Sequence, residues 1–205
     1  MAGRGGRDRV AARKARLEGH SAETDPGVVL NAAARFLEAR QRSIDEVRRH
    51  LTAAAYPADL IERAIERLTE LRMLDDETFA RSWVESRDRA HPRGDQALRR
   101  ELAVKGIHRE LIAGILEERA AGTSAAEDGE VASAQLIAAR RLLARRAAAL
   151  GRVGERQARR QRAYALLARN GFDPDVCREA VAEFERGLAA GDDSDAGDDS
   201  EPVAD

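Results

Sequence analysis

The sequence has few aromatic residues, one cysteine and no long hydrophobic run, and each of these absences excludes a class of protein. Aromatic residues make up 3% of the 205 residues, too few for a typical all-β sandwich. The single cysteine, Cys177, excludes an intramolecular disulfide and a cysteine-based zinc cluster. No stretch approaches the ~20 apolar residues of a transmembrane helix, and the basic N-terminus lacks the apolar segment of a secretory signal. We therefore expect a soluble, cytoplasmic protein.

Helix-forming residues and segregated charge take the place of these features. Ala, Leu, Arg and Glu dominate the composition, which favours α-helix. The net charge is −2, but residues 191–205 hold seven acidic residues and no basic one. Residues 131–186 hold twelve arginines against six acidic residues. A basic body with an acidic tail is typical of a protein whose partner is a polyanion, such as nucleic acid or a nucleoprotein.

Three segments repeat one hydrophobic pattern at helical spacing. Each has a leucine followed by large hydrophobic residues five, nine and fourteen positions later: Leu51, Tyr56, Leu60 and Ile65; Leu102, Ile107, Leu111 and Leu116; Leu167, Phe172, Val176 and Val181. Gly106 and Gly171 come four residues after two of these leucines, and Ala55 stands there in the first segment. A further helical stretch precedes each pair of helices. The fold class expected is all-α, with three tandem three-helix, helix-turn-helix-like repeats forming an elongated curved array.

Composition changes set the expected boundaries of these repeats. We predict a disordered basic N-terminal arm (1–27), repeat 1 (28–74), repeat 2 (75–118), a linker (119–130), repeat 3 (131–187) and a disordered acidic tail (188–205).

Capping signals predict where several helices begin. Ser43, with a glutamate three residues later, has the spacing of a capping box. Asp75 or Asp76 precedes a helical stretch, and capping explains this pair better than a metal site does. Asp173, followed by a proline, is a good start for the last helix.

The most specific stretches resemble the RecX family of regulatory proteins. LDDETFARSWVESR (74–87) is similar to the family's Leu-Asp-Asp…Phe-Ala…Arg signature, and LRRELAVKGI (98–107) to its Arg-rich helix ending in Lys-Gly-Ile. RSIDEVRRHL (42–51) resembles the second helix of the family's first unit, and the similarity covers roughly residues 28–186. Ala55-Tyr56-Pro57 departs from the expected Gly-aromatic turn.

The resemblance implies a function as well as three tandem repeats. It implies a cytoplasmic bacterial modulator of the RecA recombinase, acting in DNA repair, recombination and the SOS response. Members of the family bind the RecA–DNA filament in its groove and mainly inhibit RecA ATPase, strand exchange and co-protease activity.

Basic side chains on the helices are the candidate partner- or DNA-binding residues. They are Arg99, Arg100, Lys105, Arg109, Arg140, Arg141, Arg145, Arg146, Arg156, Arg159, Arg160, Arg162 and Arg169. A guanidinium binds phosphate or carboxylate bidentately and stays charged at any working pH. The competing explanation is a solvated face paired with glutamate, and it is strongest in the middle repeat, where residues 77–118 hold eight acidic and eight basic residues.

Catalysis and cofactors have little support in the sequence. The chain has no phosphate-binding glycine-rich loop, and its four histidines are scattered without metal-ligand spacing. Cys177 falls on the apolar stripe of its helix, which favours packing over reactivity. Trp83 is read as a core residue rather than an exposed partner anchor. We expect a monomer that is not an enzyme and holds no cofactor or metal.

Two other functions stay open beside the RecA modulator. The first is an autonomous, sequence-independent DNA-binding helical repeat protein that binds single- or double-stranded DNA weakly through phosphates. The second is an α-helical scaffold whose surface charge serves solubility. The acidic tail either competes with an anionic partner for the basic repeat or only increases solubility.

Overall fold

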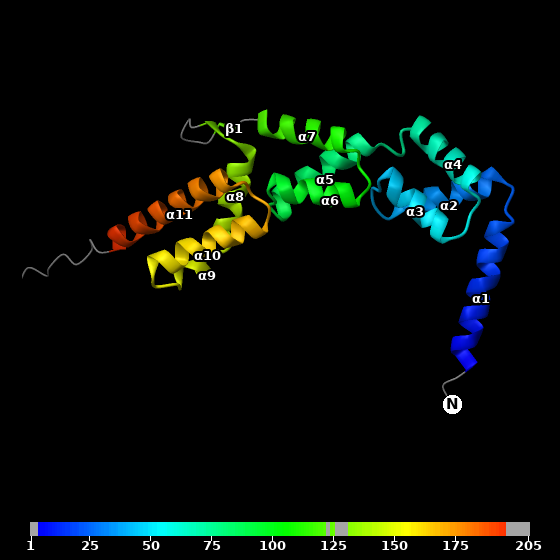
Figure 1. Cartoon of the computed structure of the whole chain (residues 1–205), viewed down its shortest axis with the longest axis horizontal. Helices are drawn as coiled ribbons and strands as arrows, with labels where there is room; N and C mark the ends of the chain where they lie inside the picture. Colours follow the sequence, from blue (N-terminus) through cyan, green and yellow to red (C-terminus); the bar gives the residue numbers. More distant parts are fainter. Residues whose placement is uncertain (1–3, 122–123, 126–130, 196–205) are drawn as a thin grey trace, which may run out of the picture. The chain divides into compact units, whose positions relative to one another are not determined.

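The computed structural model describes residues 4–121, 124–125 and 131–195, which form eleven α-helices and one two-residue strand pair (Figure 1). Repeat 1 consists of α2 (Pro26–Glu38), α3 (Ile44–Ala53) and α4 (Ala58–Glu70); repeat 2 of α5 (Asp76–Ala90), α6 (Asp95–Val104) and α7 (Arg109–Ala121); repeat 3 of α8 (Ala134–Ala144), α10 (Arg156–Arg169) and α11 (Pro174–Asp195). A short helix, α9 (Ala147–Gly151), precedes α10. The prediction of an all-α fold made of three-helix repeats is confirmed.

The chain divides into two compact units, and the division runs through repeat 2. Unit 1 comprises residues 1–82 and 102–111, and unit 2 comprises residues 83–101 and 112–205. The first turns of α5 and α7 therefore belong to unit 1, together with the end of α6.

Three segments depart from the boundaries that the sequence suggested. Helix α1 spans Arg4–Ser21, inside the arm expected to be disordered. Its arginine, alanine and leucine residues favour helix by intrinsic propensity, even without the apolar stripe that a packed helix needs. Strands β1 (Ser124–Ala125) and β2 (Val131–Ala132) pair across the expected linker. Helix α11 continues to Asp195, and the rest of the expected acidic tail lies outside the described residues.

The predicted helix starts match the structure closely. Ser43 accepts a hydrogen bond from the backbone of Glu46, whose carboxylate accepts one from Ser43 N–H, which completes the capping box. Asp75 accepts hydrogen bonds from the backbone N–H of Glu77 (3.0 Å) and from the Thr78 hydroxyl (2.5 Å) at the start of α5. Helix α11 begins at Pro174, as predicted.

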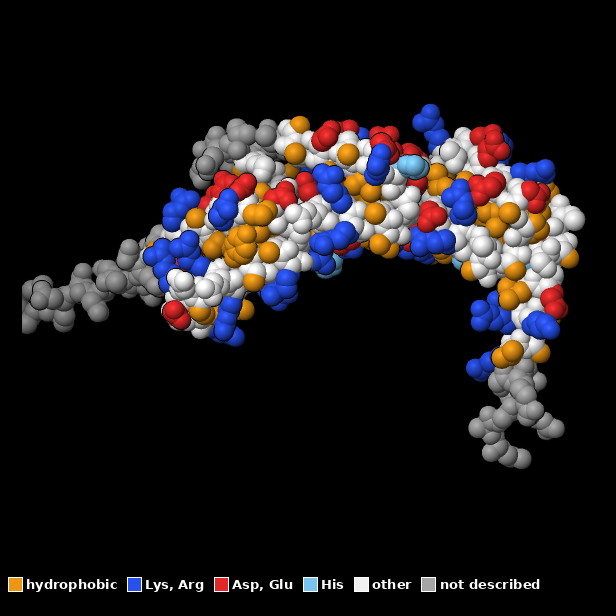
Figure 2. Space-filling view, viewed as in Figure 1, with side chains coloured by type: hydrophobic (Ala, Val, Ile, Leu, Met, Phe, Trp, Pro, Cys, Tyr) orange, Lys and Arg blue, Asp and Glu red, His pale blue; other side chains and the backbone are white. Residues whose placement is uncertain are grey.

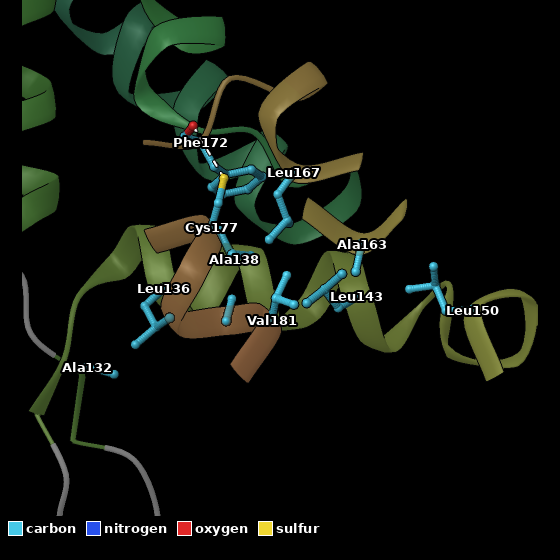
Figure 3. Packing of buried hydrophobic residues seen from close by; sticks show 12 residues of the cluster. Ala132, Leu136, Ala138, Leu143, Leu150, Ala163, Leu167, Phe172, Cys177 and Val181 are labelled. Carbon is cyan, nitrogen blue, oxygen red and sulfur yellow. Dashed lines mark hydrogen bonds between the residues drawn. The ribbon is translucent and has the colours of Figure 1, made fainter. Parts of the chain in front are cut away.

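The terminal repeats each enclose a hydrophobic core. In unit 1, Val29 of α2 and Val47 of α3 are fully buried against α4. In unit 2, the core of α8, α10 and α11 surrounds Cys177, which has no exposed surface (Figure 3). Burial, and then the neighbouring Asp173 carboxylate, raise the pKa of the Cys177 thiol. The prediction that Cys177 packs in the core is confirmed.

The same backbone turn joins the second and third helices of every repeat. The anchor leucines are fully buried, and each anchor carbonyl accepts a hydrogen bond from the N–H five residues later: Tyr56 to Leu51 (3.3 Å), Ile107 to Leu102 (3.1 Å) and Phe172 to Leu167 (3.3 Å). The residue before that donor has a left-handed φ, of 65° at Ala55 and 80° at Gly106 and Gly171. This is the Schellman motif, in which glycine is favoured because it has no Cβ.

In unit 1, the turn of repeat 2 is seated on the start of α3. The Ser43 hydroxyl donates a hydrogen bond to the Lys105 carbonyl over 2.6 Å, and the Lys105 ammonium lies 2.6 Å from the Glu46 carboxylate. A Cβ added at Gly106 would come within 2.3 Å of the Asp45 Cβ. Gly106 therefore serves both the left-handed turn and the close approach to α3.

In unit 2, the turn of repeat 3 is seated on the start of α6 in the same way. Gly94 N–H donates to the Asn170 carbonyl (3.0 Å), and Gln96 N–H donates to the Gly171 carbonyl (3.2 Å). A Cβ at Gly171 would lie 2.4 Å from the backbone nitrogen of Ala97. Because Ser43 and Gly94 both precede their anchor leucines by eight residues, the two repeat junctions use equivalent positions.

The turn of repeat 1 is covered by α1. His20 lies 2.9 Å through Nδ1 from the Ala54 carbonyl, and its ring stacks on Tyr56 at 4.2 Å. Ala54 is the counterpart of Lys105 and Asn170, so His20 contacts the carbonyl that a preceding repeat would otherwise contact. Helix α1 thus covers the face of repeat 1 that a neighbouring repeat covers in repeats 2 and 3.

The shared turn predicts that substitutions at equivalent positions change the free energy of unfolding in opposite directions. We expect Gly171→Ala to lower the free energy of unfolding by more than about 2 kcal/mol, because the new Cβ is strained and meets backbone. Ala55→Gly should raise it by about 0.5–1 kcal/mol, because glycine removes the left-handed strain. Urea denaturation measures both variants, and equal effects of the two would contradict the account of the turn.

The Glu46 carboxylate makes one repeat junction sensitive to acid. Burial raises its pKa, but hydrogen bonds from Lys105 and Arg40 and from the Ser43 backbone outweigh burial and lower the pKa to about 2. Because this folded-state pKa lies below the usual 4.5, the stabilisation is complete above about pH 4.5 and is lost as the pH falls towards 2.

We therefore expect Glu46→Gln to flatten the loss of stability between pH 4.5 and 2, and to cost about 1–3 kcal/mol at pH 7. Urea denaturation at several pH values measures this. Glu62→Gln is the matched control, since the ion pair of Glu62 with Arg48 is exposed. A wild-type pH profile that Glu46→Gln leaves unchanged would refute the assignment.

Candidate nucleic-acid interface

Several of the predicted basic residues hold the fold together rather than facing solvent. Arg159 of α10 binds the Glu185 carboxylate of α11 bidentately, at 2.7 and 3.0 Å. The side chain of Glu185 is 3% exposed, and hydrogen bonds from Arg159 lower its pKa against the effect of burial. This pair joins the second and third helices of repeat 3, so Arg159 is a structural residue.

Four other predicted residues also bind groups of the chain itself. Lys105 binds Glu46 at the junction of repeats 1 and 2, and Arg140 of α8 binds Glu183 of α11. Arg145 donates to the carbonyls of Arg89 (2.7 Å) and Ala90 at the end of α5, and Arg141 lies 3.5 Å from the carbonyl of Asp88. These contacts occupy donors that a phosphate would otherwise use.

The remaining predicted residues are exposed and available to a partner. Six have no hydrogen bond or ion pair within the described chain: Arg99, Arg100, Arg146, Arg160, Arg162 and Arg169. Arg109 is 92% exposed beside Glu110, and Arg156 is 72% exposed at 3.4 Å from Glu185. The Arg109–Glu110 pair is exposed on both sides and contributes at most about 1 kcal/mol. Arg156 makes the longer of the two arginine contacts with Glu185 and is the more exposed of the two, so a polyanion can bind either Arg109 or Arg156. The structure therefore separates eight candidate contact residues from five that hold or cap its helices.

Unit 2 contains a basic hollow where the α5–α6 connection meets α8 and α10. Its volume is about 270 Å³, and Arg145 and Arg146 line it together with His91, Arg93 and Asn170. Arg93 also donates to the Asn170 side chain. No acidic residue lines the hollow, but Arg93 pairs with Glu101 at 3.4 Å, so Arg145 and Arg146 supply the positive charge that suits an anionic group. No local pattern in the sequence points to His91, Arg93 and Asn170, because only the packing of repeats 2 and 3 brings them together.

Helix α1 presents further basic side chains. Arg9, Arg13, Lys14 and Arg16 are all exposed, and Figure 2 shows blue side chains on more than one side of this helix. Of these four, Lys14 lies 3.7 Å from the exposed Glu18. A helix with no apolar stripe offers a partner mainly charge.

The described residues show no arrangement suited to catalysis at a metal. No group of three or more His, Cys, Asp or Glu side chains among them could hold a metal ion. None of the described helices is long and apolar enough to cross a membrane. Trp83 is half-buried, donates a hydrogen bond to Glu101 over 2.8 Å and lies under the Arg87 guanidinium, so it contributes to packing within unit 2.

Comparisons with known proteins agree with this architecture. Residues 30–68 match the family model for the first three-helix domain of RecX, and residues 75–116 match the model for its second three-helix domain. The regulatory protein RecX of Prosthecochloris aestuarii is 30% identical over 162 residues, which are 79% of this chain and 97% of that protein. The chain belongs to the RecX family.

A second RecX relative and a RecX crystal structure are also similar to this chain. The RecX protein of Mycolicibacterium smegmatis is 40% identical over 88 residues, which are 43% of this chain and 47% of that protein. The crystal structure of RecX from Lactobacillus salivarius has a TM-score of 0.64 at 20% identity, covering 78% of this chain and 97% of that one. The shared fold is thus a helical repeat array of the RecX type.

Because some arginines bind carboxylates of the fold and others do not, substitutions of two arginines on α10 should affect stability differently. We expect Arg159→Gln to lower the free energy of unfolding by about 2 kcal/mol or more, because it leaves the buried Glu185 without its main partner. Arg162→Gln, at an exposed site without a partner, should change it by less than about 0.5 kcal/mol. Thermal and urea denaturation measure both, and a stable Arg159→Gln variant would argue against a structural role.

Proposed function

We propose that this chain modulates the RecA recombinase by binding the RecA–DNA filament in its groove. The effect proposed is mainly inhibition of RecA ATPase, strand exchange and co-protease activity. The observation that carries the proposal is the match over 97% of a regulatory RecX protein. As parts of the same proposal, the chain acts as a cytoplasmic monomer in DNA repair, recombination and the SOS response, and it catalyses no reaction itself.

The exposed arginines supply a physical basis for filament binding. A RecA–DNA filament presents a regular series of DNA phosphates, and exposed guanidinium groups bind phosphates without reading sequence. Arg162 and Arg169 of α10 make no hydrogen bond or ion pair with the described residues, and Arg160 acts on Glu185 only through its charge. Three similar repeats give the chain several surfaces of one kind, which suits a partner that repeats along its axis.

Autonomous DNA binding is the second candidate, and the same partner-free arginines favour it. Such binding would occur without RecA, would ignore sequence and would weaken steeply with salt. A titration of labelled DNA in the absence of RecA separates it from filament modulation. Strong sequence selectivity at high salt would favour a base-reading protein and contradict both candidates.

The single-strand-DNA-dependent ATPase of the cognate RecA, titrated with this protein at fixed salt, tests the proposal. Inhibition well below one copy per RecA would indicate action at filament ends, and inhibition near stoichiometry would indicate binding along the groove. An unchanged ATPase and unchanged filament length with this protein in excess would overturn the proposal.

Substitution of the exposed arginines should weaken the inhibition of RecA ATPase without lowering the stability of the protein. We expect Arg162→Gln with Arg169→Gln to raise the half-inhibitory concentration and to lower its log–log dependence on salt by about two, one for each lost phosphate contact. The control is Arg35→Gln with Arg63→Gln, which removes two exposed, partner-free charges from unit 1. Equal effects of the two pairs would show that only net charge matters.

A further inference from the structure

Repeat 3 has a second hollow, between α10 and α11, and among the proposed filament contacts only Arg160 lines it. Its volume is about 580 Å³, within the usual range of ligand sites of roughly 300–1,000 Å³. Helix α10 contributes Gln157, Arg160, Gln161 and Tyr164 to its lining. Arg178 lines it from α11, so both walls carry an arginine.

The spacing along α10 places these side chains in two adjacent rows. Gln157 and Gln161 are four residues apart, as are Arg160 and Tyr164, and residues four apart lie on one face of a helix. Val181 of α11, which is 4% exposed and belongs to the core in Figure 3, is the apolar base between the two helices. The hollow thus combines an apolar base, polar amides and two cationic side chains.

Tyr164 is the unusual residue of this hollow. Its side chain is among the few large apolar groups that stay exposed in the described chain, at 36%. Its hydroxyl makes no hydrogen bond to the described residues. A tyrosine that is exposed at the wall of a concave site, and whose hydroxyl makes no hydrogen bond within the fold, offers the face of its ring to a ligand.

The charged side chains that line the hollow indicate which class of ligand it can bind. No acidic residue lines the hollow. Arg160 makes no ion pair with the described residues and acts on Glu185 only through its charge, and Arg178 pairs with the exposed Asp175 one turn earlier on α11. An anionic ligand is therefore favoured. An acidic peptide would satisfy the arginines but would leave the tyrosine ring without a stacking partner.

We propose that the α10–α11 hollow binds single-stranded nucleic acid, with one base stacked on Tyr164 and neighbouring phosphates on Arg160 and Arg178. A single strand offers phosphates and unstacked bases together, whereas a duplex keeps its bases stacked inside. Aromatic platforms beside cationic side chains are a common means of binding single strands without sequence preference. The amides of Gln157 and Gln161 add donors and acceptors for base edges.

This inference goes beyond the RecA proposal and does not depend on it. The hollow lies within unit 2 and needs no filament. Direct strand binding can therefore fail while RecA is still inhibited, and the reverse is equally possible.

The test is fluorescence anisotropy of a labelled oligo-dT strand and of a duplex, titrated with the full chain at low salt without RecA. Stacking contributes about 1–3 kcal/mol per base, so we expect Tyr164→Ala to weaken single-strand binding about five-fold or more. Duplex affinity should change less than two-fold. Tyr164→Phe keeps the ring and should bind like the wild type.

A strand carrying 2-aminopurine gives a second readout, because stacking on an aromatic ring quenches its fluorescence. The quenching should occur with the wild type and Tyr164→Phe and be lost with Tyr164→Ala. Arg160→Gln should lower the log–log salt dependence by about one, and Arg63→Gln on α4 is the matched charge control. Circular dichroism confirms that each variant is folded.

Three results would overturn the proposal. One is the absence of single-strand binding at low salt. Another is a Tyr164→Ala variant that binds the strand like the wild type or loses strand and duplex affinity equally. The third is poly-glutamate binding that depends on Tyr164 while oligo-dT binding does not, which would assign the hollow to an acidic peptide.

Discussion

The left-handed turn after each buried anchor leucine is the constraint on which the rest of the structure depends. The turn ends the second helix of a repeat and aims the third helix back across the core. In repeats 2 and 3 the turn also packs closely against the preceding repeat. This is possible because Gly106 and Gly171 have no side chain, and a Cβ at either position would clash with that repeat. Ala55 tolerates the same φ where His20, rather than another repeat, covers the turn.

Some arginines of this protein stabilise the fold and others are available to a partner, and the burial of the carboxylate beside each arginine decides which. Where a guanidinium meets a shielded carboxylate, as Arg159 meets Glu185, removing either partner leaves an uncompensated charge in the interior. Where it projects into water without a partner, as at Arg162, it contributes little to folding and remains available to phosphates. The net excess of arginine in repeat 3 therefore overstates the charge available to a partner.

Repeat 3 also differs from the others in ways that concentrate candidate contacts there. The short α9 is added before α10, and α10 begins eleven residues before its anchor leucine, whereas α3 and α6 begin seven residues before theirs. The position equivalent to Ser43 and Gly94 is thus Arg159, which lies inside a helix rather than at a helix start. The longer α10 instead forms one wall of the hollow that carries Tyr164.

The sequence by itself determined the helical class, the three-fold repeat and several helix starts, because these depend on local spacing and capping. The anchors Leu51, Leu102 and Leu167 were readable because burial at helical spacing leaves a periodic pattern. Only the tertiary structure decided which arginines remain free, since Arg159 and Arg162 look alike until α11 brings Glu185 beside one of them. The hollow of Tyr164 and Arg178 likewise joins residues of two helices that no local pattern relates, because packing rather than spacing brings them together.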